Sequence, residues 1–227
     1  MCGRFTQSKL GNAIAEIFQL TEVPALTPRY NIAPTQSVAT ILKTVALEEK
    51  QLKMLHWGLI PSWAKDRSIA VKLINARAET VSIKPAFRSA FRQRRCLVLA
   101  DGFYEWQQQE NKTIKQPFYF RFRDEHPFAL AGLWESWQDV TGKIIDSCTI
   151  LTTEANKLVS SIHHRMPVIL NPADYDLWLD PGVKKLEVLH NLLRPYPTDD
   201  LISYPVTKAV NNANYDSVSC IDRLESS

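Results

Sequence analysis

The chain has 227 residues, of which 45% are hydrophobic and 22% charged, and its net charge is +3, as in an ordinary globular protein. No apolar run reaches the roughly 18–20 residues that cross a bilayer, and the N-terminus lacks the apolar stretch of a secretory signal. Composition therefore excludes a membrane-spanning chain, and we expect one cytoplasmic domain over residues 1–227.

The N-terminal half predicts one helix followed by strands. Apolar residues recur at helical spacing up to Phe18, which predicts a helix over residues 8–18 with Ser8 as its N-cap. A proline-bearing loop at 27–36 precedes a strand over 37–44. A second strand begins near Leu52 and reaches the aromatic turn at 56–63. The segment 84–95 predicts a short helix that carries a basic cluster.

The second half alternates apolar and polar residues more regularly. Residues 96–106 predict one buried strand that ends at Glu105, and residues 117–137 predict a hairpin around a turn at 124–127. A buried strand follows at 148–153. Two helices are expected after it, one from Asn171 to Trp178 with Pro172 in its first turn, and one over 183–193. Because strands outnumber helices and most joins look antiparallel, the fold class predicted is α+β. The last ten residues are polar, and we expect them to form a mobile tail.

The cysteines and glycines give no sign of a metal or nucleotide site. The four cysteines lie more than fifty residues apart, without the close pairs typical of structural zinc. Cys96 and Cys148 stand in apolar runs and are expected to be buried. The seven glycines form no phosphate-binding pattern, so we expect neither a metal nor another cofactor.

A cluster of basic residues lies within twelve positions; its members are Lys84, Arg88, Arg92, Arg94 and Arg95. Such a cluster is either a solvated helix face or a surface that binds phosphates. Composition does not decide between the two.

Cys2 has chemistry that an internal cysteine lacks. Removal of Met1 would leave an α-amine and a thiol on adjacent carbons, with reference pKa values of about 7.7–8.0 and 8.5. A 1,2-aminothiol condenses with an aldehyde to an imine, and the thiol then closes a thiazolidine ring. If Met1 stays in place, the ring cannot close.

Three polar side chains stand where an apolar strand has no need of them. Glu105 follows a run that looks buried, so its carboxylate must be paired, for instance with an arginine, or functional. Asn75 and Arg77 project to the same face of an extended segment. Asn75 either orients an amine or serves as a turn residue. Arg77 either holds a phosphate or is a cation on the surface.

Histidines and tryptophans supply further candidates. His163 and His164 precede Arg165, and because they are adjacent, at most one of them is expected to face a given site. Trp57 and Trp63 bracket a turn, and either of them can pack in the core. Trp63 is expected at the tip of the loop, where the alternative is to stack on a base.

Seven segments together resemble the SRAP family of SOS-response-associated peptidases, also called abasic-site processing proteins. In order they are MCGRF, RYNIAPTQ, WGLIPSW, INARAET, ADGFYEW, HHRMPVIL and YPVTKAVNN. The resemblance runs over nearly the whole chain. It implies an α+β fold in which mainly antiparallel strands form a barrel-like core surrounded by helices.

The resemblance also implies roles for single residues. The family's catalytic residues correspond to Cys2, Asn75, Glu105 and His163, and its DNA contacts to Arg4, Arg77, Trp63 and Thr152. It implies a cross-link between Cys2 and an abasic site in single-stranded DNA or at a single-strand/double-strand junction. Removal of Met1 by the protein itself and weak strand scission are further implied activities, and the protein is expected to act as a monomer on nucleoid DNA.

Two other functions are compatible with the same residues. An N-terminal MCG also occurs in glutamine amidotransferases, whose terminal cysteine attacks an amide. A binding module could hold single-stranded DNA reversibly through Arg77, Trp63 and the basic cluster, which would leave Cys2 dispensable. Glutamine hydrolysis and a Cys2→Ala variant separate these functions from covalent capture.

Overall fold

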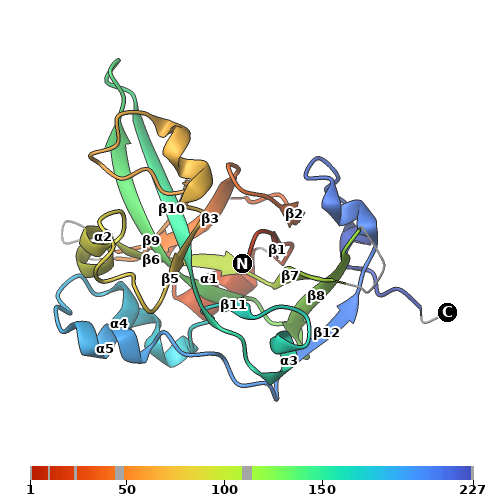
Figure 1. The fold of residues 1–227 in the computed structure, drawn as a ribbon. Coiled ribbons are helices and arrows are strands. Elements are labelled where there is room, and N and C mark those ends of the chain that lie inside the picture. Colours follow the sequence, from red (N-terminus) through yellow and green to blue (C-terminus); the bar gives the residue numbers. More distant parts are fainter. Residues whose placement is uncertain (1, 10, 23–24, 44–48, 109–113, 226–227) are drawn as a thin grey trace.

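Two β-sheets and a few short helices make up the protein, and the computed structural model describes residues 2–9, 11–22, 25–43, 49–108 and 114–225 (Figure 1). The strands are β1 (Phe5–Gln7), β2 (Arg29–Ile32), β3 (Ser37–Leu42), β4 (Gln51–Trp57), β5 (Asn75–Arg77), β6 (Arg95–Ala100), β7 (Gly102–Gln107), β8 (Gln116–Phe122), β9 (Phe128–Gln138), β10 (Ile144–Glu154), β11 (Arg165–Pro167) and β12 (Leu201–Pro205). The α-helices are α1 (Asn12–Phe18), α2 (Arg88–Gln93), α3 (Lys157–Ser160), α4 (Tyr175–Leu179) and α5 (Leu186–Asn191). The α+β class is confirmed.

The larger sheet closes on itself into a barrel. Its strand order is β10-β4-β3-β6-β9, and the ring closes because β9 also pairs with β10. Most pairs are antiparallel, as expected, but β10 runs parallel to β4 and to β5. The long strand β10 thus carries β5 on one edge and the short strand β11 on the other.

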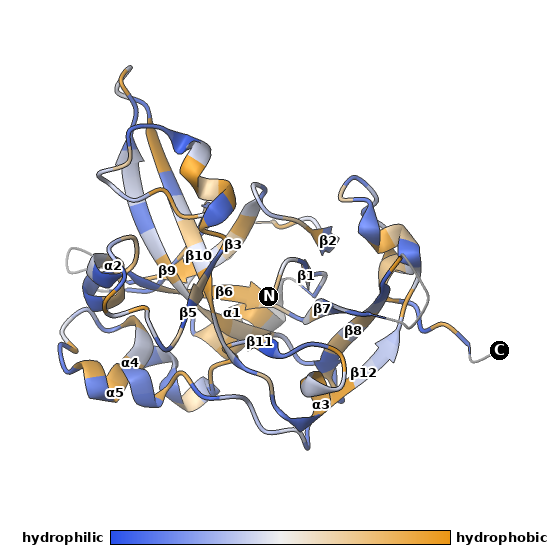
Figure 2. Cartoon of the chain, viewed as in Figure 1, coloured by the Kyte–Doolittle hydropathy of each residue, from blue (hydrophilic) through white to orange (hydrophobic). Residues whose placement is uncertain are grey.

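Both faces of the barrel strand β6 are covered, which explains its continuous apolar sequence. Leu97 and Leu99 pack with the helices, whereas Cys96 and Val98 pack with aromatic residues of the smaller sheet. Figure 2 shows the hydrophobic colouring concentrated on the central strands around β6. Cys96 and Cys148 are fully buried, as the sequence predicts.

The smaller sheet holds the N-terminal strand between two others. Its order is β12-β8-β7-β1-β2, all pairs being antiparallel. Phe5 lies opposite Phe103 of β7 on one side and Ile32 of β2 on the other. This placement brings the N-terminus into the middle of the molecule (Figure 1).

Two of the predicted strand arrangements are wrong. Residues 96–106 form two strands, because β6 ends before Asp101 and the chain then passes from the barrel to the smaller sheet. Glu105 therefore lies within β7 rather than at a strand end. Residues 117–137 form no hairpin: β8 pairs with β7 and β12, and β9 pairs with β6 and β10. The connection between them changes sheets through Glu125, whose φ of 62° turns the chain sharply.

The helices match the expected positions, with shorter bounds. The helix predicted over 8–18 begins only at Asn12, after Gly11 with φ 120°, and Ser8 does not cap it. Leu10 lies outside the described residues. In the helix predicted from Asn171 to Trp178, the Asn171 side chain is the N-cap and accepts from the Ala173 amide. That helix begins with a 3₁₀ turn over Pro172–Asp174 and continues as α4.

The C-terminal segment packs onto the rest of the chain as far as residue 224. A 3₁₀ helix over Val218–Ile221 buries Cys220, and the Leu224 amide donates to the Pro205 carbonyl. Mobility of the last ten residues stays a prediction. Within the described ranges, no helix has the length and apolar character needed to span a membrane.

Candidate active site

Cys2 is fully buried at the start of the smaller sheet. Its Sγ lies 3.9 Å from the Arg4 carbonyl oxygen, and none of its surface is exposed. Burial raises the pKa of the thiol, and the nearby Glu105 carboxylate raises it further. A thiol in this position needs a base to give up its proton.

Glu105 is a buried carboxyl beside Cys2. Its position on β7, the strand that pairs with β1, keeps the side chain only 2% exposed. Burial raises its pKa to about 7, because the charged form loses the solvation of water. Its Oε2 lies 3.7 Å from His163 Nδ1. The carboxyl can therefore both accept and donate a proton near neutrality.

His163 is held by the backbone that follows it. The Arg165 amide donates to its Nδ1 at 3.1 Å, and the Arg165 carbonyl oxygen lies 3.0 Å from the same atom. Burial lowers the pKa of His163, which favours the neutral ring at pH 7. Nδ1 accepts from the amide in one tautomer of the neutral ring and donates to the carbonyl oxygen in the other. His164 is exposed, with its ring centroid 4.4 Å from that of His163.

Asn75 and Thr152 lie on the paired strands β5 and β10. Asn75 Nδ2 is 3.5 Å from the Ile150 carbonyl oxygen, and its buried Oδ1 has no hydrogen-bond partner among the described residues. A buried amide oxygen in this state is available to accept from an amine. Thr152 is fully buried and lies opposite Arg77, whose side chain is exposed.

Arg165 is a site residue that sequence reasoning did not single out. Its guanidinium makes a two-pronged ion pair with Glu79 at 2.5 and 3.0 Å, and donates to the Thr152 carbonyl oxygen at 2.6 Å. These bonds fix the backbone that holds His163. Its place two residues after His163 in HHRMP was the available signal.

Arg4 points into the protein rather than toward solvent. Its Nη1 donates to Asn31 Oδ1 at 2.9 Å and to the Val210 carbonyl oxygen at 2.5 Å. Burial lowers the pKa of its guanidinium. Its Nη2 also donates to the Asn211 carbonyl oxygen at 3.4 Å, so three of its five N–H donors are committed to the protein, and a DNA contact by Arg4 remains a prediction.

The two tryptophans of the aromatic turn differ in environment. Trp57 is buried, with Nε1 donating to the Ile74 carbonyl oxygen at 2.9 Å. Trp63 is 60% exposed, so a flat aromatic surface faces solvent. The exposed ring of Trp63 is accessible to a base that stacks on it.

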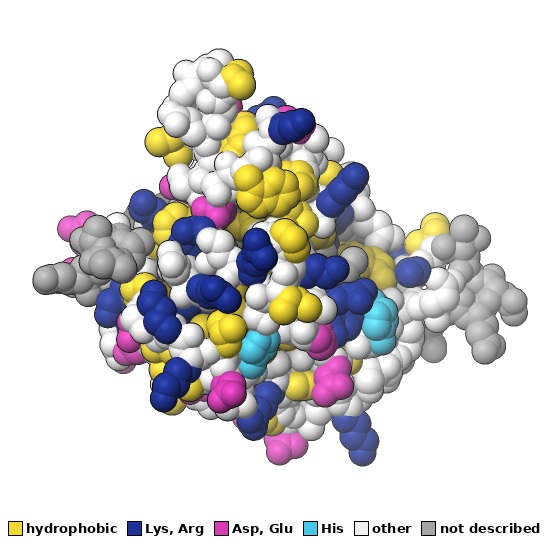
Figure 3. All heavy atoms as spheres, turned by 60° about the vertical axis from the view of Figure 1, so that its left-hand side comes forward, with side chains coloured by type: hydrophobic (Ala, Val, Ile, Leu, Met, Phe, Trp, Pro, Cys, Tyr) yellow, Lys and Arg dark blue, Asp and Glu magenta, His cyan; other side chains and the backbone are white. Residues whose placement is uncertain are grey.

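The basic cluster divides into two groups. Arg95 is buried and donates to the carbonyl oxygens of Phe91 and Trp178, and Arg94 pairs with Glu135 at 2.7 Å. Lys84, Arg88 and Arg92 are exposed. Figure 3 shows Lys and Arg side chains spread over one face of the molecule. Only the exposed members of the cluster are available to a phosphate backbone.

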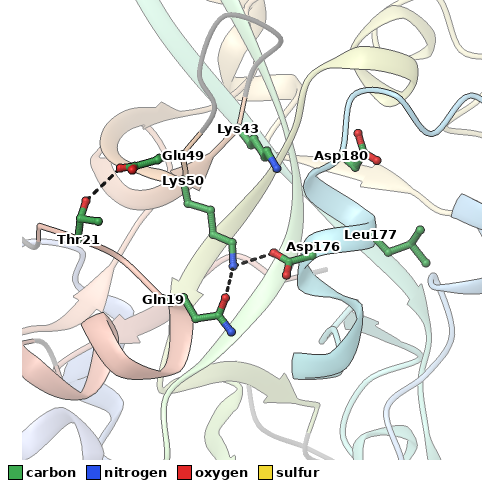
Figure 4. Close-up of a pocket in the computed structure, with 8 residues that line it drawn as sticks. All are labelled: Gln19, Thr21, Lys43, Glu49, Lys50, Asp176, Leu177 and Asp180. Atoms are coloured by element: carbon green, nitrogen blue, oxygen red, sulfur yellow. Dashed lines mark hydrogen bonds and ion pairs between the residues drawn. The ribbon is translucent and has the colours of Figure 1, made fainter.

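A cavity of about 660 Å³ lies apart from these residues, between α1, α4 and the residues before β4 (Figure 4). Lys50 points toward Asp176 and pairs with it at 2.7 Å, and it also donates to Gln19. In the part of the chain that the structure describes, no group of three His, Cys, Asp or Glu residues is placed to hold a metal ion.

Comparison with known proteins identifies the family. The model of the family described as SOS response associated peptidase (SRAP) matches residues 1–213. The chain belongs to the SRAP family. The abasic site processing protein YoqW of Bacillus subtilis (strain 168) is 42% identical to this SRAP chain over 225 residues, or 98% of this chain and 99% of that protein. HMCES of Xenopus tropicalis, also an abasic site processing protein, is 30% identical over 227 residues, or 86% of this chain and 65% of its own length.

Solved structures share the SRAP chain's fold. An X-ray structure of a protein from Bacteroides thetaiotaomicron superposes with a TM-score of 0.78 at 25% sequence identity, covering 99% of this chain and 100% of that one. A protein from Bordetella bronchiseptica gives a TM-score of 0.74 at 28% identity, covering 91% and 100%. The family expected from the sequence segments is thereby confirmed, while the roles of single residues stay predictions.

Proposed function

We propose that this SRAP protein captures abasic sites in single-stranded DNA, or at a single-strand/double-strand junction, by a covalent bond to Cys2. The observation that carries the proposal is the placement of Glu105, with a pKa of about 7, beside the Cys2 thiol and 3.7 Å from His163. The names of the relatives YoqW and HMCES support the same substrate. Capture would shield the lesion during replication and repair.

The chemistry uses both groups of Cys2 once Met1 has been removed. The α-amine adds to the aldehyde of the ring-opened sugar, and the carbinolamine loses one water to give an imine. The thiol then adds to the imine carbon, its proton passes to the nitrogen, and a thiazolidine results. Glu105 takes the proton from the α-ammonium and returns one to the departing hydroxyl.

The other candidate residues have supporting roles. The buried Asn75 Oδ1 accepts from the amine and orients it. His163 assists opening of the closed sugar and the reverse reaction. The imine also acidifies the neighbouring C–H, which permits weak strand scission by β-elimination. Arg77 and Arg4 would hold phosphates flanking the lesion, Thr152 would line the pocket, and Trp63 would stack on a base.

The test mixes protein lacking Met1 with an oligonucleotide that carries one abasic site, followed by a denaturing gel and intact mass. We expect an adduct with the mass of protein plus DNA minus one water, present with Cys220→Ser and absent with Cys2→Ala. Cys220 is the matched control, because it is a second buried thiol away from Glu105.

Other outcomes identify the alternatives. Unchanged DNA retention by Cys2→Ala, without an adduct from the wild type, would indicate a reversible single-strand binder. Release of ammonia from glutamine that depends on Cys2 would indicate an amidotransferase-like hydrolase. Either result contradicts covalent capture.

A further inference from the structure

Asp101 binds the N-terminal segment, defined as residues 2–9, at several points. Its Oδ2 accepts from the Ser8 amide at 2.5 Å, the Ser8 hydroxyl at 2.9 Å and the Lys9 amide at 2.5 Å. Its Oδ1 accepts from the Thr6 hydroxyl. Asp101 is only 4% exposed, so the bond to Thr6 is buried and those to Ser8 and Lys9 are partly buried. Four donors of one segment thus bond this carboxylate, three at Oδ2 and one at Oδ1.

A tyrosine extends this network behind the segment. The Tyr119 hydroxyl lies 2.9 Å from Thr6 Oγ1, and because the single Thr6 proton goes to Asp101, Tyr119 must donate. Burial and the Asp101 carboxylate raise the pKa of Tyr119, so it keeps that proton. Gly102 makes room for it: a Cβ at position 102 would lie 2.1 Å from the tyrosine oxygen.

The backbone continues the connection to Glu105. The Asp101 amide donates to the Thr6 carbonyl oxygen, and the Tyr104 amide donates to the Arg4 carbonyl oxygen. One stretch of chain, residues 101–105, therefore holds the N-terminal segment at its first residue and carries the acid–base carboxyl at its last.

We infer that Asp101 is a positioning residue, which holds Cys2 in register with Glu105 through its bonds to Thr6, Ser8 and Lys9. It does not touch the reacting atoms. This role rests on the proposed function, and a misplacement of about 1 Å at a reacting pair can cost on the order of 100-fold in rate. These bonds fix the end of the segment beyond β1, whereas the β1 pairing and the side chains of Arg4 and Gln7 fix its earlier residues.

The decisive variant is Asp101→Asn, which keeps the size of the side chain. Its amide group offers one acceptor atom and turns N–H donors toward the donors of Ser8 and Lys9. We expect the single-turnover rate of adduct formation to fall about 10- to 100-fold. The Kd for DNA carrying tetrahydrofuran, an abasic analogue without an aldehyde, should stay within about twofold, because no phosphate-binding group changes.

Alkylation of Cys2 by iodoacetamide, mapped by peptide mass, provides a second readout that is independent of DNA. Cys2 is fully buried in the wild type and should react slowly; Asp101→Asn should speed this reaction several-fold while Cys148 stays protected. Glu135→Gln is the matched control, since Glu135 is also a buried carboxylate, paired with Arg94. It should cost stability without changing either Cys2 readout.

Equal adduct rates and equal Cys2 alkylation in Asp101→Asn and Glu135→Gln would overturn the inference. Should Asp101→Asn fail to fold, Tyr119→Phe and Ser8→Ala decide, because each removes one bond of the network and should give a smaller loss of the same kind. A wild type that forms no adduct contradicts the proposed function instead, and the alkylation readout then still decides whether Asp101 holds Cys2.

Discussion

A carboxyl group that is buried without full compensation makes a folded protein less stable whenever it is charged. Glu105 is such a group, because burial raises its pKa from 4.5 to about 7. Its neutral form is favoured in the folded state, so its contribution to stability is fully present below about pH 4.5 and is lost as the pH rises through 7. The acid–base function proposed for this residue thus has a cost in stability.

Glu105→Gln should therefore be more stable than the wild type at high pH. The shift corresponds to a difference in the free energy of unfolding of up to about 3 kcal/mol at pH 8 and near zero at pH 4. Urea unfolding at both pH values measures it, with Glu154→Gln as an exposed control on β10. A difference that does not change with pH would show that Glu105 titrates at its ordinary value.

At the scale of elements, the segment 101–105 joins the barrel to the smaller sheet, and close packing restricts which side chains fit in it. Gly102 is adjacent to the Tyr119 hydroxyl, and the Tyr119 ring packs against Tyr104 in a tilted arrangement, with ring centroids 5.0 Å apart. A side chain at position 102 has no space unless Tyr119 moves, which would break its bond to Thr6.

Gly102→Ala should destabilise the protein by about 1–3 kcal/mol, the usual cost of overpacking a buried site. Thermal unfolding measures the change. Gly182→Ala is the control, since its added Cβ would meet only the flexible, exposed Asp180 side chain. Equal melting temperatures for the two variants would contradict the close approach of Tyr119.

Local patterns predicted the elements well and their pairing poorly. Strand β3, helix α2 and the start of a helix at Asn171 were predicted from local sequence patterns, and a buried carboxyl was expected at Glu105. The assignment of β8 and β9 to different sheets was not predictable. Two strands with alternating polarity around a short turn have the same sequence pattern whether they pair with each other or with other strands. Ser8 was predicted to cap a helix, but its amide and hydroxyl donate instead to Asp101, 93 residues away.

The candidate site was predicted to the level of residue type. Cys2, Glu105 and His163 were named from sequence, and the structure brings Glu105 close to both of the others. The inward orientation of Arg4 was not predicted, because its partners come from the far end of the chain. The part played by Arg165 depends likewise on Glu79, 86 positions away.

At the scale of the whole molecule, the C-terminal segment is tied to the N-terminal one through Asn31. This fully buried amide donates to the carbonyl oxygens of Val210, Asn212 and Tyr215 at 3.2, 3.0 and 2.7 Å, and accepts from Arg4. Arg4 and residues 210–215 thus meet beside β2.

Asn31→Ala should lower the free energy of unfolding by about 2–3 kcal/mol, because it leaves buried carbonyl groups and one guanidinium N–H without partners. Hydrogen exchange should rise in residues 207–216 before the rest of the protein opens. Asn214→Ala, an exposed change in the same segment, is the control. Unchanged exchange in that segment would show that other contacts hold it.

The burial of Cys2 also sets a time limit during synthesis. Strand β1 is made first, yet its partner β7 ends at residue 107, so the N-terminus cannot be enclosed until that residue has been translated. At about 5–20 residues per second, this leaves roughly 5–20 s in which the nascent chain exposes its first residues. Cys2 is therefore accessible to soluble reagents and enzymes during this interval, and its thiol becomes buried once the sheet is complete.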